Sequence, residues 1–433
     1  MQTDFKQFLY SDMASELYKT AQQSTSDPLR KTGNPLHDSG LDYAEQFFGS
    51  IRREKLVIAD EEASSLLGKS IGTYFTVHTG DLRLLSEEDR HNCRTALRSA
   101  VFDAAAQLCP DFQIPVDAWE NNICGTTTAD FGFDKGTVLR TTIDDPGEDA
   151  WDRLAVSPEW DQGAHLHPTP PASVNRDPAA ESVLPEGEPF VRDDTDRTAV
   201  TDIPPAPLSE QTPFRPMTIL AAGLGNPALT TDALGPMCIS HLHVTRHMLG
   251  ENGEAAVFPF GGQMHRLCAI TPLVLGKTGI ETLELVRGAV DAVHPDLVIL
   301  LDALAASELG SLTKTVQIST TGIHPGGGVG NKRQPLDRNT LGVPVMTIGV
   351  PTVIAASTLI YRALEGAGIL REQDAPDDIQ NRILHSALAS ADVGYVAPKD
   401  IDESVAEFSC LIADILNELA LGKTLASSLG HRF

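Results

Sequence analysis

Two aspartates stand where an open α/β sheet places its chemistry. Asp232 comes shortly after the apolar run 217–222 and a glycine-rich turn, and Asp302 comes directly after the apolar run 297–301. Ligands gather at the carboxyl ends of parallel strands, so we expect both carboxylates on one rim of the sheet. If they lie close together, like-charge repulsion raises one pKa, and one acid holds a proton. Such a pair can activate a water molecule for amide hydrolysis.

Each aspartate also has a structural explanation. Asp232 precedes a predicted helix, and an aspartate in that place commonly caps the helix; capping and catalysis are compatible. Asp302 is harder to explain in this way, because burying a carboxylate at the end of an apolar strand is costly without a partner. Taken alone, Asp302 is therefore the stronger of the two candidates.

A nucleotide site is the first alternative that the glycines suggest. The segment 223–228 matches Gly-x-Gly-x-x-Ala after a strand, which is the pattern of dinucleotide-binding turns. Three features oppose this interpretation. Pro227 falls where the helix should open, the predicted helix begins several residues later, and no acidic residue ends a second strand where it could bind a ribose. The glycine-dense segment 322–333 also fails as a phosphate loop, because Lys332 follows an asparagine.

Histidines could add to the site. The density of glycine in 322–333 indicates a backbone that bends sharply or approaches a ligand closely. His324, within this segment, is either a third polar group beside the aspartates or an exposed loop side chain. His243 and His247 share one face of a predicted helix, 235–247. The sequence has no glutamate between them in the zincin arrangement, so we favour a structural role over a metal site.

The hydrophobic pattern predicts strands that alternate with helices. Continuous apolar runs are typical of buried parallel strands, and a period of 3.6 is typical of helices. We expect strands at 71–78, 217–222, 297–301 and 343–350, and helices at 87–108 (capped by Ser86), 235–247, 279–293, 352–364 and 401–421. This order predicts an α/β fold in which helices flank a mostly parallel or mixed central sheet.

Four segments of the chain differ in composition and hydrophobic pattern. Residues 1–40 are polar and suggest a mobile leader, and residues 41–109 suggest an α+β addition to the catalytic domain. Residues 110–215 are acidic and hold half of the 28 prolines, which predicts a weakly ordered insertion, although all three tryptophans lie there. Residues 216–433 are the predicted catalytic core with its C-terminal helices.

The composition excludes several classes of function. The chain has 433 residues and a net charge of −26, which opposes binding to nucleic acid or to an anionic membrane. Its six cysteines are scattered, with no Cys-x-x-Cys pair, so we expect neither a disulfide framework nor a zinc ribbon. The first residues lack the pattern of a secretory signal, and no apolar run approaches the length of a membrane span. We therefore expect a cytoplasmic protein.

Several motifs, in order along the chain, resemble those of the spore germination proteases. They include the glycine turn before Asp232, the acidic motif at Asp302 and the long glycine loop around His324. The matching segments are 223–226, 231–236, 244–247, 278–282, 302–305, 321–333 and 349–353. The resemblance is dense over about 216–355 and loose over 41–107 and 395–421.

The resemblance implies an endopeptidase that degrades small acid-soluble DNA-binding proteins during germination, in the forespore or spore core. It implies that Asp232 and Asp302 are catalytic, with His324, Glu281 and Asn226 in support. It also implies a fold similar to that of hydrogenase-maturation proteases, which use carboxylates and a histidine around a metal. A divalent metal held by Asp232, Asp302 and His324 is therefore an alternative. We favour a metal-free pair that needs no cofactor.

The leader resembles the family's cleavage site, in which an acidic residue precedes a large apolar one. We predict cleavage between Asp12 and Met13, by a zymogen that removes its own leader. Acidic pH would favour a protonated Asp12 and a shared proton in the catalytic pair, so we expect pH to gate this step. The resemblance also implies a homotetramer. The insertion at 110–215 is longer than the family's linker, and a binder of spore proteins that does not cut is the other reading.

Overall fold

The computed structural model describes residues 11–25, 40–115, 214–248, 263–324, 334–367, 386–391, 394–423 and 426. The chain divides into two compact units, one of residues 1–126 with 212–433 and one of residues 127–211. The second unit lies outside the described residues, as does most of the predicted insertion at 110–215. All of the described residues belong to the first unit.

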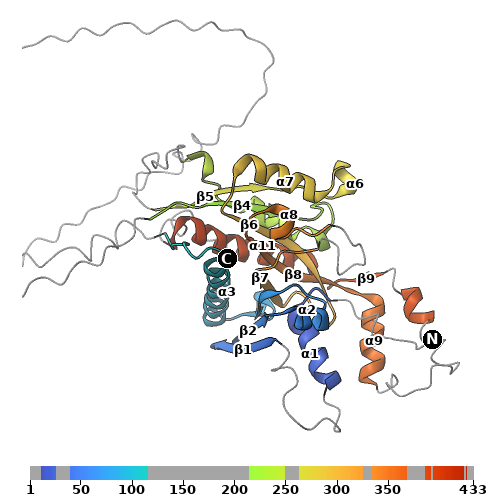
Figure 1. Cartoon of the computed structure of the whole chain (residues 1–433). Coiled ribbons are helices and arrows are strands. Elements are labelled where there is room, and N and C mark those ends of the chain that lie inside the picture. Colours follow the sequence, from blue (N-terminus) through green and yellow to red (C-terminus); the bar gives the residue numbers. More distant parts are fainter. Residues whose placement is uncertain are drawn as a thin grey trace, which may run out of the picture. The chain divides into compact units, whose positions relative to one another are not determined.

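The described strands form one mixed sheet in the order β1-β2-β3-β7-β8-β6-β4-β5, with β9 paired to β8 (Figure 1). Strands β5, β4, β6 and β8 are parallel to their neighbours in that series, whereas β1, β2, β3, β7 and β9 pair antiparallel. The strands are β1 (Leu41–Phe48), β2 (Ile51–Ile58), β3 (Gly72–His78), β4 (Thr218–Gly223), β5 (Arg266–Ile270), β6 (Leu297–Ala306), β7 (Thr315–Ser319), β8 (Val345–Ala355) and β9 (Tyr395–Val396). The predicted α/β class with a mixed central sheet is confirmed.

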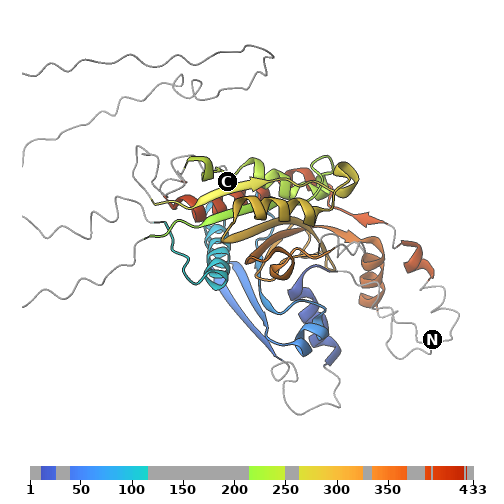
Figure 2. The same ribbon diagram turned by 45° about the horizontal axis from the view of Figure 1, so that its top comes forward.

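One face of the sheet is covered by α3 (Glu87–Leu108), α5 (Leu234–Ser240) and α11 (Ile401–Leu421), which share the largest apolar core with it (Figure 2). Ser86 caps α3 as predicted, because its hydroxyl accepts a hydrogen bond from the Asp89 amide at 3.1 Å. The strand residues of this core alternate with residues that face the other way, as the pleat requires. Among the described residues, no helix is both long enough and apolar enough to cross a membrane.

The opposite face carries two separate groups of helices. Helices α7 (Thr282–Val293) and α8 (Arg338–Leu341) pack over β4 and β6. Helices α1 (Ala14–Thr25) and α2 (Glu61–Leu67) pack over β1, β2 and β3. The remaining short elements are η2 (Leu82–Leu84), η4 (Thr230–Asp232), η5 (Arg246–Met248), α6 (Leu275–Thr278) and α9 (Ala356–Gly366). Strands β7 and β8 lie between the two groups (Figure 1).

The predicted helix 235–247 is too long. Helix α5 ends at Ser240, and the chain then runs alongside β5 because the Thr245 amide donates to the Leu267 carbonyl at 2.8 Å. The Leu267 amide in turn donates to the Thr245 hydroxyl at 2.8 Å. His243 and His247 therefore do not share a helical face.

Two strands are longer than predicted, and the described part of the leader forms a helix. Strands β6 and β8 stay paired as far as Ala306 and Ile354, with a bulge that leaves Thr352 without a partner in the β6–β8 register. Consequently Asp302 lies inside β6 rather than at its end, and the helix predicted at 352–364 begins at Ala356. The described part of the leader, 11–25, is docked on the sheet as α1, because Ala14 and Tyr18 enter the apolar cluster there.

Candidate active site

The structure brings the two predicted aspartates together at the end of β4. Strand β4 stops at Gly223, which pairs with Leu301, so Asp302 is the first residue of β6 beyond that partner. The chain then turns into η4, whose last residue is Asp232. The Thr352 hydroxyl donates to the Thr231 carbonyl at 2.7 Å and ties this turn to the bulge of β8.

The glycines of the turn allow this close approach. Gly225 has a positive φ of +110°, and a Cβ there would lie 2.1 Å from the Asp232 carbonyl oxygen. A Cβ on Gly235 would lie 2.4 Å from the carbonyl oxygens of both Leu224 and Leu301. The Gly-x-Gly pattern therefore serves to pack the Asp232 turn against β6, which removes the need for a nucleotide to explain it.

Asp302 has the properties of an acid that keeps its proton. Its side chain is 7% exposed. Burial raises the pKa of Asp302 well above its ordinary value, and the nearby carboxylates of Asp232 and Asp12 raise it further. Asp232 is only partly buried, and its Oδ2 accepts a hydrogen bond from the Asn226 amide at 2.8 Å, which suits a carboxylate anion. The two carboxyl groups thus differ in burial and in hydrogen bonding.

The segment with the predicted cleavage site lies on β6 beside this pair. The Asp12 amide donates to the Ala305 carbonyl at 2.9 Å, and the Ala305 amide donates back to Oδ2 of Asp12 at 2.9 Å. Met13 and Ala14 are fully buried. The bond between Asp12 and Met13 is therefore held in a fixed position three residues along the strand from Asp302.

The carbonyl oxygen of Asp12 receives two side-chain hydrogen bonds. Nζ of Lys69 donates to it at 2.9 Å, and Nε2 of Gln317 donates at 3.0 Å. Asp12 lines a cavity of about 460 Å³. The cavity is lined by residues that include Asp12, Lys69, Tyr74, Gln317, Ser319, His324 and Thr347.

Downstream of the predicted bond, Glu16 binds the residue that directly follows β6. Its Oε2 accepts hydrogen bonds from the Ser307 amide at 2.7 Å and from the Ser307 hydroxyl at 2.8 Å. The Ser11 hydroxyl donates to the same oxygen at 2.6 Å. Ser11 also accepts a hydrogen bond from the Met13 amide at 3.0 Å. The chain from Ser11 to Glu16 is thereby folded tightly around the Asp12–Met13 bond.

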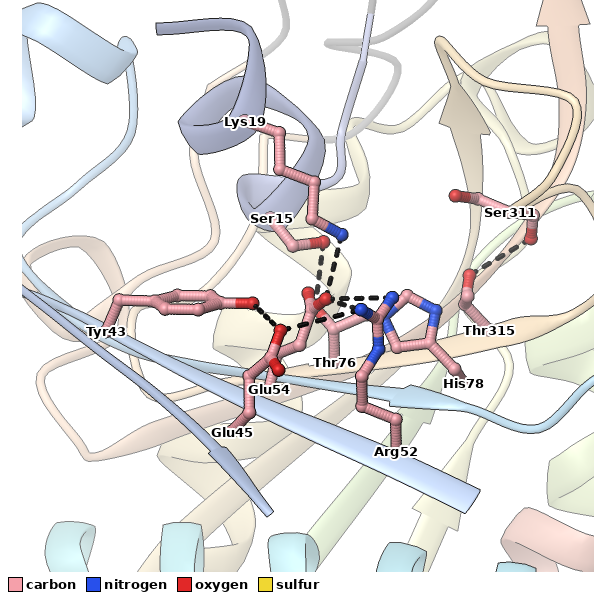
Figure 3. A network of polar contacts seen from close by, with 10 residues as sticks. All are labelled: Ser15, Lys19, Tyr43, Glu45, Arg52, Glu54, Thr76, His78, Ser311 and Thr315. Atoms are coloured by element: carbon pink, nitrogen blue, oxygen red, sulfur yellow. Dashed lines mark hydrogen bonds and ion pairs between the residues drawn. The ribbon is translucent and has the colours of Figure 1, made fainter. Parts of the chain in front are cut away.

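A buried polar network holds α1 on the sheet (Figure 3). Oε1 of Glu54, which is 1% exposed, lies 2.8 Å from Nζ of Lys19 and 3.1 Å from both Arg52 Nη2 and His78 Nε2. Burial alone would raise the pKa of Glu54, but the hydrogen bonds from His78 and Lys19 outweigh it and lower the pKa to about 2. The glutamate therefore stays ionised and fixes the helix that follows the predicted cleavage site.

The three supporting residues predicted from the sequence have different positions. Asn226 contacts Asp232 through its backbone amide, and its side chain accepts from the Ala228 amide at 3.1 Å. Glu281 occupies the N-cap of α7, and its contacts are those of a capping box with Glu284. His324 is exposed and lines the cavity that Asp12 also lines.

The predicted metal alternative lacks a ligand cluster. Among the residues that the structure describes, no three His, Cys, Asp or Glu side chains are placed to hold a metal ion. Asp232, Asp302 and His324 thus do not converge as a ligand set.

Sequence reasoning missed Lys69, Gln317 and Ser307. Gln317 is a long polar side chain in the otherwise apolar part of β7, and that departure is a usable signal. Lys69 follows the glycine that ends α2, a common surface position, so nothing local marks it. Ser307 is an ordinary serine after a strand, and its role depends wholly on the docked leader.

Comparison with known proteins identifies the family of the chain. The family model described as germination protease matches residues 208–367, which include Asp232 and Asp302. The germination protease of Caldanaerobacter subterraneus is 41% identical over 213 residues, which cover 46% of this chain and 64% of that protein. The germination protease of Bacillus pumilus is 35% identical over 258 residues, which cover 49% of this chain and 68% of that protein. The chain therefore belongs to the germination protease family.

The match has limits in length. The chain covers less than two thirds of the first relatives, with 64% of the Caldanaerobacter protein and 65% of the Bacillus subtilis germination protease, which is 37% identical. A solved structure, the NiFe hydrogenase maturation protease HycI from Thermococcus kodakarensis, aligns at a TM-score of 0.24 and 17% identity. That alignment covers 46% of this chain and 92% of the other, and a TM-score so low carries no argument.

Proposed function

We propose that this protein is an endopeptidase that cuts its own chain between Asp12 and Met13, with Asp232 and Asp302 as the catalytic pair. Membership of the germination protease family supports a peptidase. The observation that carries the proposal is the docking of the leader on β6. The backbone and the carboxylate of Asp12 both bind Ala305, three residues beyond Asp302.

The two acids divide the reaction according to their surroundings. Burial, followed by the charges of Asp232 and Asp12, raises the pKa of Asp302 and favours its protonated form. Asp232 then acts as the base and takes a proton from water while the oxygen attacks the carbonyl carbon of Asp12. The C–N bond breaks as Asp302 gives its proton to the nitrogen of Met13. Transfer of the proton from Asp232 to Asp302 restores the starting state.

The proposed external substrates are proteins that present a segment like the leader. An acidic residue before a large apolar residue, with a second acid four positions after the first, would repeat the contacts of Asp12 and Glu16. Small acid-soluble spore proteins are the substrates we propose, in the forespore or spore core during germination. The relatives' name, germination protease, supports this setting. We also propose a homotetramer, which sedimentation of the full chain would test.

The test is to follow the N-terminus of the full-length protein by intact-mass spectrometry at mildly acidic and at neutral pH. We expect residues 1–12 to be lost from the parent and retained in Asp302→Asn and Asp232→Asn. Asp402→Asn, at an exposed position of α11, is the matched control and should process normally. Identical processing in the parent and in Asp302→Asn would remove Asp302 from the mechanism. Equal rates at the two pH values would remove the pH gate.

Treatment with a chelator tests the alternative in which the protein is a metallopeptidase. We expect unchanged processing after dialysis against EDTA. Loss of processing that a divalent ion restores would favour the metallopeptidase instead. A parent that binds small acid-soluble spore protein without cutting it or itself would identify a binding protein.

A further inference from the structure

The carbonyl oxygen of Asp12 has more hydrogen-bond donors than simple docking of the leader requires. The leader is already anchored by the Asp12 contacts with Ala305 and by the Glu16 contacts with Ser307. Lys69 and Gln317 nevertheless converge on this one oxygen at 2.9 Å and 3.0 Å. An oxyanion hole places donors 2.7–3.1 Å from the position of the oxyanion, and this carbonyl oxygen is the atom that becomes the oxyanion when the carbon is attacked.

The backbone fixes the position of Lys69. Helix α2 ends at Leu67, and Gly68 adopts a left-handed conformation with φ of 62°. The Lys69 amide donates back to the Ser64 carbonyl at 3.2 Å, which closes the last turn. The half-buried side chain then reaches the cavity. Burial lowers the pKa of Lys69, whereas the carboxylates of Asp12 and Glu16 raise it, so those two acids help to retain its charge.

The second donor is held more rigidly. Gln317 lies in β7, where it pairs with Thr76 of β3 and with Gly349 of β8. Oε1 of its side chain accepts a hydrogen bond from the Ala14 amide at 2.7 Å. Because the backbone N–H of Ala14 can only donate, its partner on Gln317 is the side-chain oxygen. The NH₂ group of Gln317 is therefore directed toward Asp12. Gln317 thus spans the Asp12–Met13 bond from one side to the other.

Gln317 also faces the same way as the proposed acid. Asp302, Gly349 and Gln317 stand in one row on three adjacent strands. Their side chains share one face, and two strand spacings separate Asp302 from Gln317 by about 10 Å at the Cα atoms. The residue between them has no side chain. The side chain of Leu304 packs over Gly349 and fills the space between Asp302 and Gln317.

We infer that Lys69 and Gln317 form the oxyanion hole of this enzyme and stabilise the negative charge that develops on the Asp12 carbonyl oxygen when water attacks. This inference rests on the proposed function and adds two catalytic residues to it. A lysine cation and an amide donor in a partly buried site supply more stabilisation to an oxyanion than to the neutral carbonyl. They therefore lower the barrier rather than only holding the leader.

The experiment measures the first-order rate of leader loss in the full-length protein. We expect Lys69→Met and Gln317→Glu each to lower this rate about 100-fold, the usual effect of losing one oxyanion donor. Gln317→Glu keeps an acceptor for the Ala14 amide, removes the donor and places a negative charge beside the developing oxyanion. Lys69→Arg keeps a cationic donor and should recover most of the rate. Lys399→Met, at an exposed lysine, is the matched control and should process at the parental rate.

A second measurement separates catalysis from docking. In the Asp302→Asn background, which keeps the leader attached, hydrogen exchange of the Ala14 amide reports whether the segment stays on β7. Unchanged protection of Ala14 in Lys69→Met, together with the slower cleavage, supports the oxyanion hole. Protection that falls as much as the rate would mean that Lys69 only anchors the leader, and this would overturn the inference.

The outcomes also distinguish this inference from the proposed function. A parent that never loses its leader contradicts the proposed function and the inference with it. A parent that processes in an Asp302-dependent way, while Lys69→Met and Gln317→Glu process at its rate, overturns the oxyanion hole alone. If Lys69→Met does not fold, as judged by circular dichroism, the comparison of Gln317→Glu with Lys69→Arg still decides.

Discussion

The carboxylate of Glu16 is held by Ser307 through two hydrogen bonds, from the backbone amide at 2.7 Å and from the hydroxyl at 2.8 Å. Ser307 is the residue immediately after β6, the strand that carries Asp302. One strand thus offers the proposed acid and, five residues later, a binding site for an acidic side chain of the leader. This spacing sets the orientation in which a peptide binds along the site.

Removal of the Ser307 hydroxyl should slow leader loss. A hydrogen bond to a charged group contributes about 1.5–3 kcal/mol, so we expect Ser307→Ala to lower the processing rate by about 10- to 100-fold. Time courses of intact mass measure this effect. Ser65→Ala, at an exposed position of α2, is the matched control. Equal rates for the two variants would mean that the Glu16 contact does not position the bond.

Asp302→Asn should stabilise the unprocessed protein at neutral pH. The folded pKa of Asp302 is raised, first by burial and then by Asp232 and Asp12, so protonation favours the folded state. The stability it contributes is present below the unfolded pKa of about 3.9 and is lost as pH rises toward the folded pKa. Asparagine cannot ionise and avoids this loss.

Urea denaturation at neutral pH and near pH 4 tests this expectation on chains shown by mass to be unprocessed. The gain from Asp302→Asn should be clear at neutral pH and should shrink near pH 4. An asparagine variant that is less stable than the parent at neutral pH would show that the carboxylate is favourably paired.

His265 should make the fold sensitive to acid. Its Nδ1 accepts from the Met217 amide at 3.1 Å, and its Nε2 lies 2.9 Å from the Gln113 carbonyl, which requires the neutral ring. Burial lowers the pKa of His265 to about 4, although the Gln113 carbonyl and Asp296 oppose this shift. The lowered pKa stabilises the fold above the unfolded pKa of about 6.5, and that stability is lost as pH falls toward 4.

Unfolding free energies between pH 7 and pH 4 measure this effect, which amounts to about 3 kcal/mol for a shift of this size. His265→Gln should flatten the pH profile, whereas His91→Gln, at an exposed position of α3, should leave it unchanged. A profile with the same slope in parent and His265→Gln would assign the acid sensitivity to other groups.

Replacement of residues 116–213 by a short linker should leave the core folded. The two flanks of this segment meet, because the Arg215 amide donates to Oε1 of Gln113 at 3.2 Å. His265 packs against both Phe112 and Phe214, with ring centroids 5.2 Å apart in each case. A flexible linker of about six residues spans such a gap.

Near-ultraviolet circular dichroism and leader loss measure the outcome. We expect the shortened chain to keep a cooperative unfolding transition and to process at a rate close to that of the parent. Retained folding with changed cleavage of small acid-soluble spore protein would assign the segment to substrate handling. Loss of the cooperative transition would show that folding of the core depends on residues 116–213.

Sequence patterns predicted the parts of this fold that local chemistry specifies. Ser86 and the helix after it, the strand of Phe75 and the apolar strand before Asp302 all follow from short-range rules. The ends of elements were less accurate where pairing with distant residues decides them. Strand β6 continues past Asp302 because β8 stays in register with it, and no property of residues 302–306 alone announces this.

For the site, the apolar runs of the sequence by themselves predicted the two aspartates, and the resemblance to the family's cleavage site predicted the acidic–apolar step at Asp12 and Met13. Only the tertiary structure decided that Lys69 and Gln317 meet the carbonyl of Asp12 and that Ser307 meets Glu16. Those contacts join residues separated by 57, 305 and 291 positions. Hydrogen bonds over such separations depend on how the strands and helices pack, which the local pattern of a single sequence does not encode.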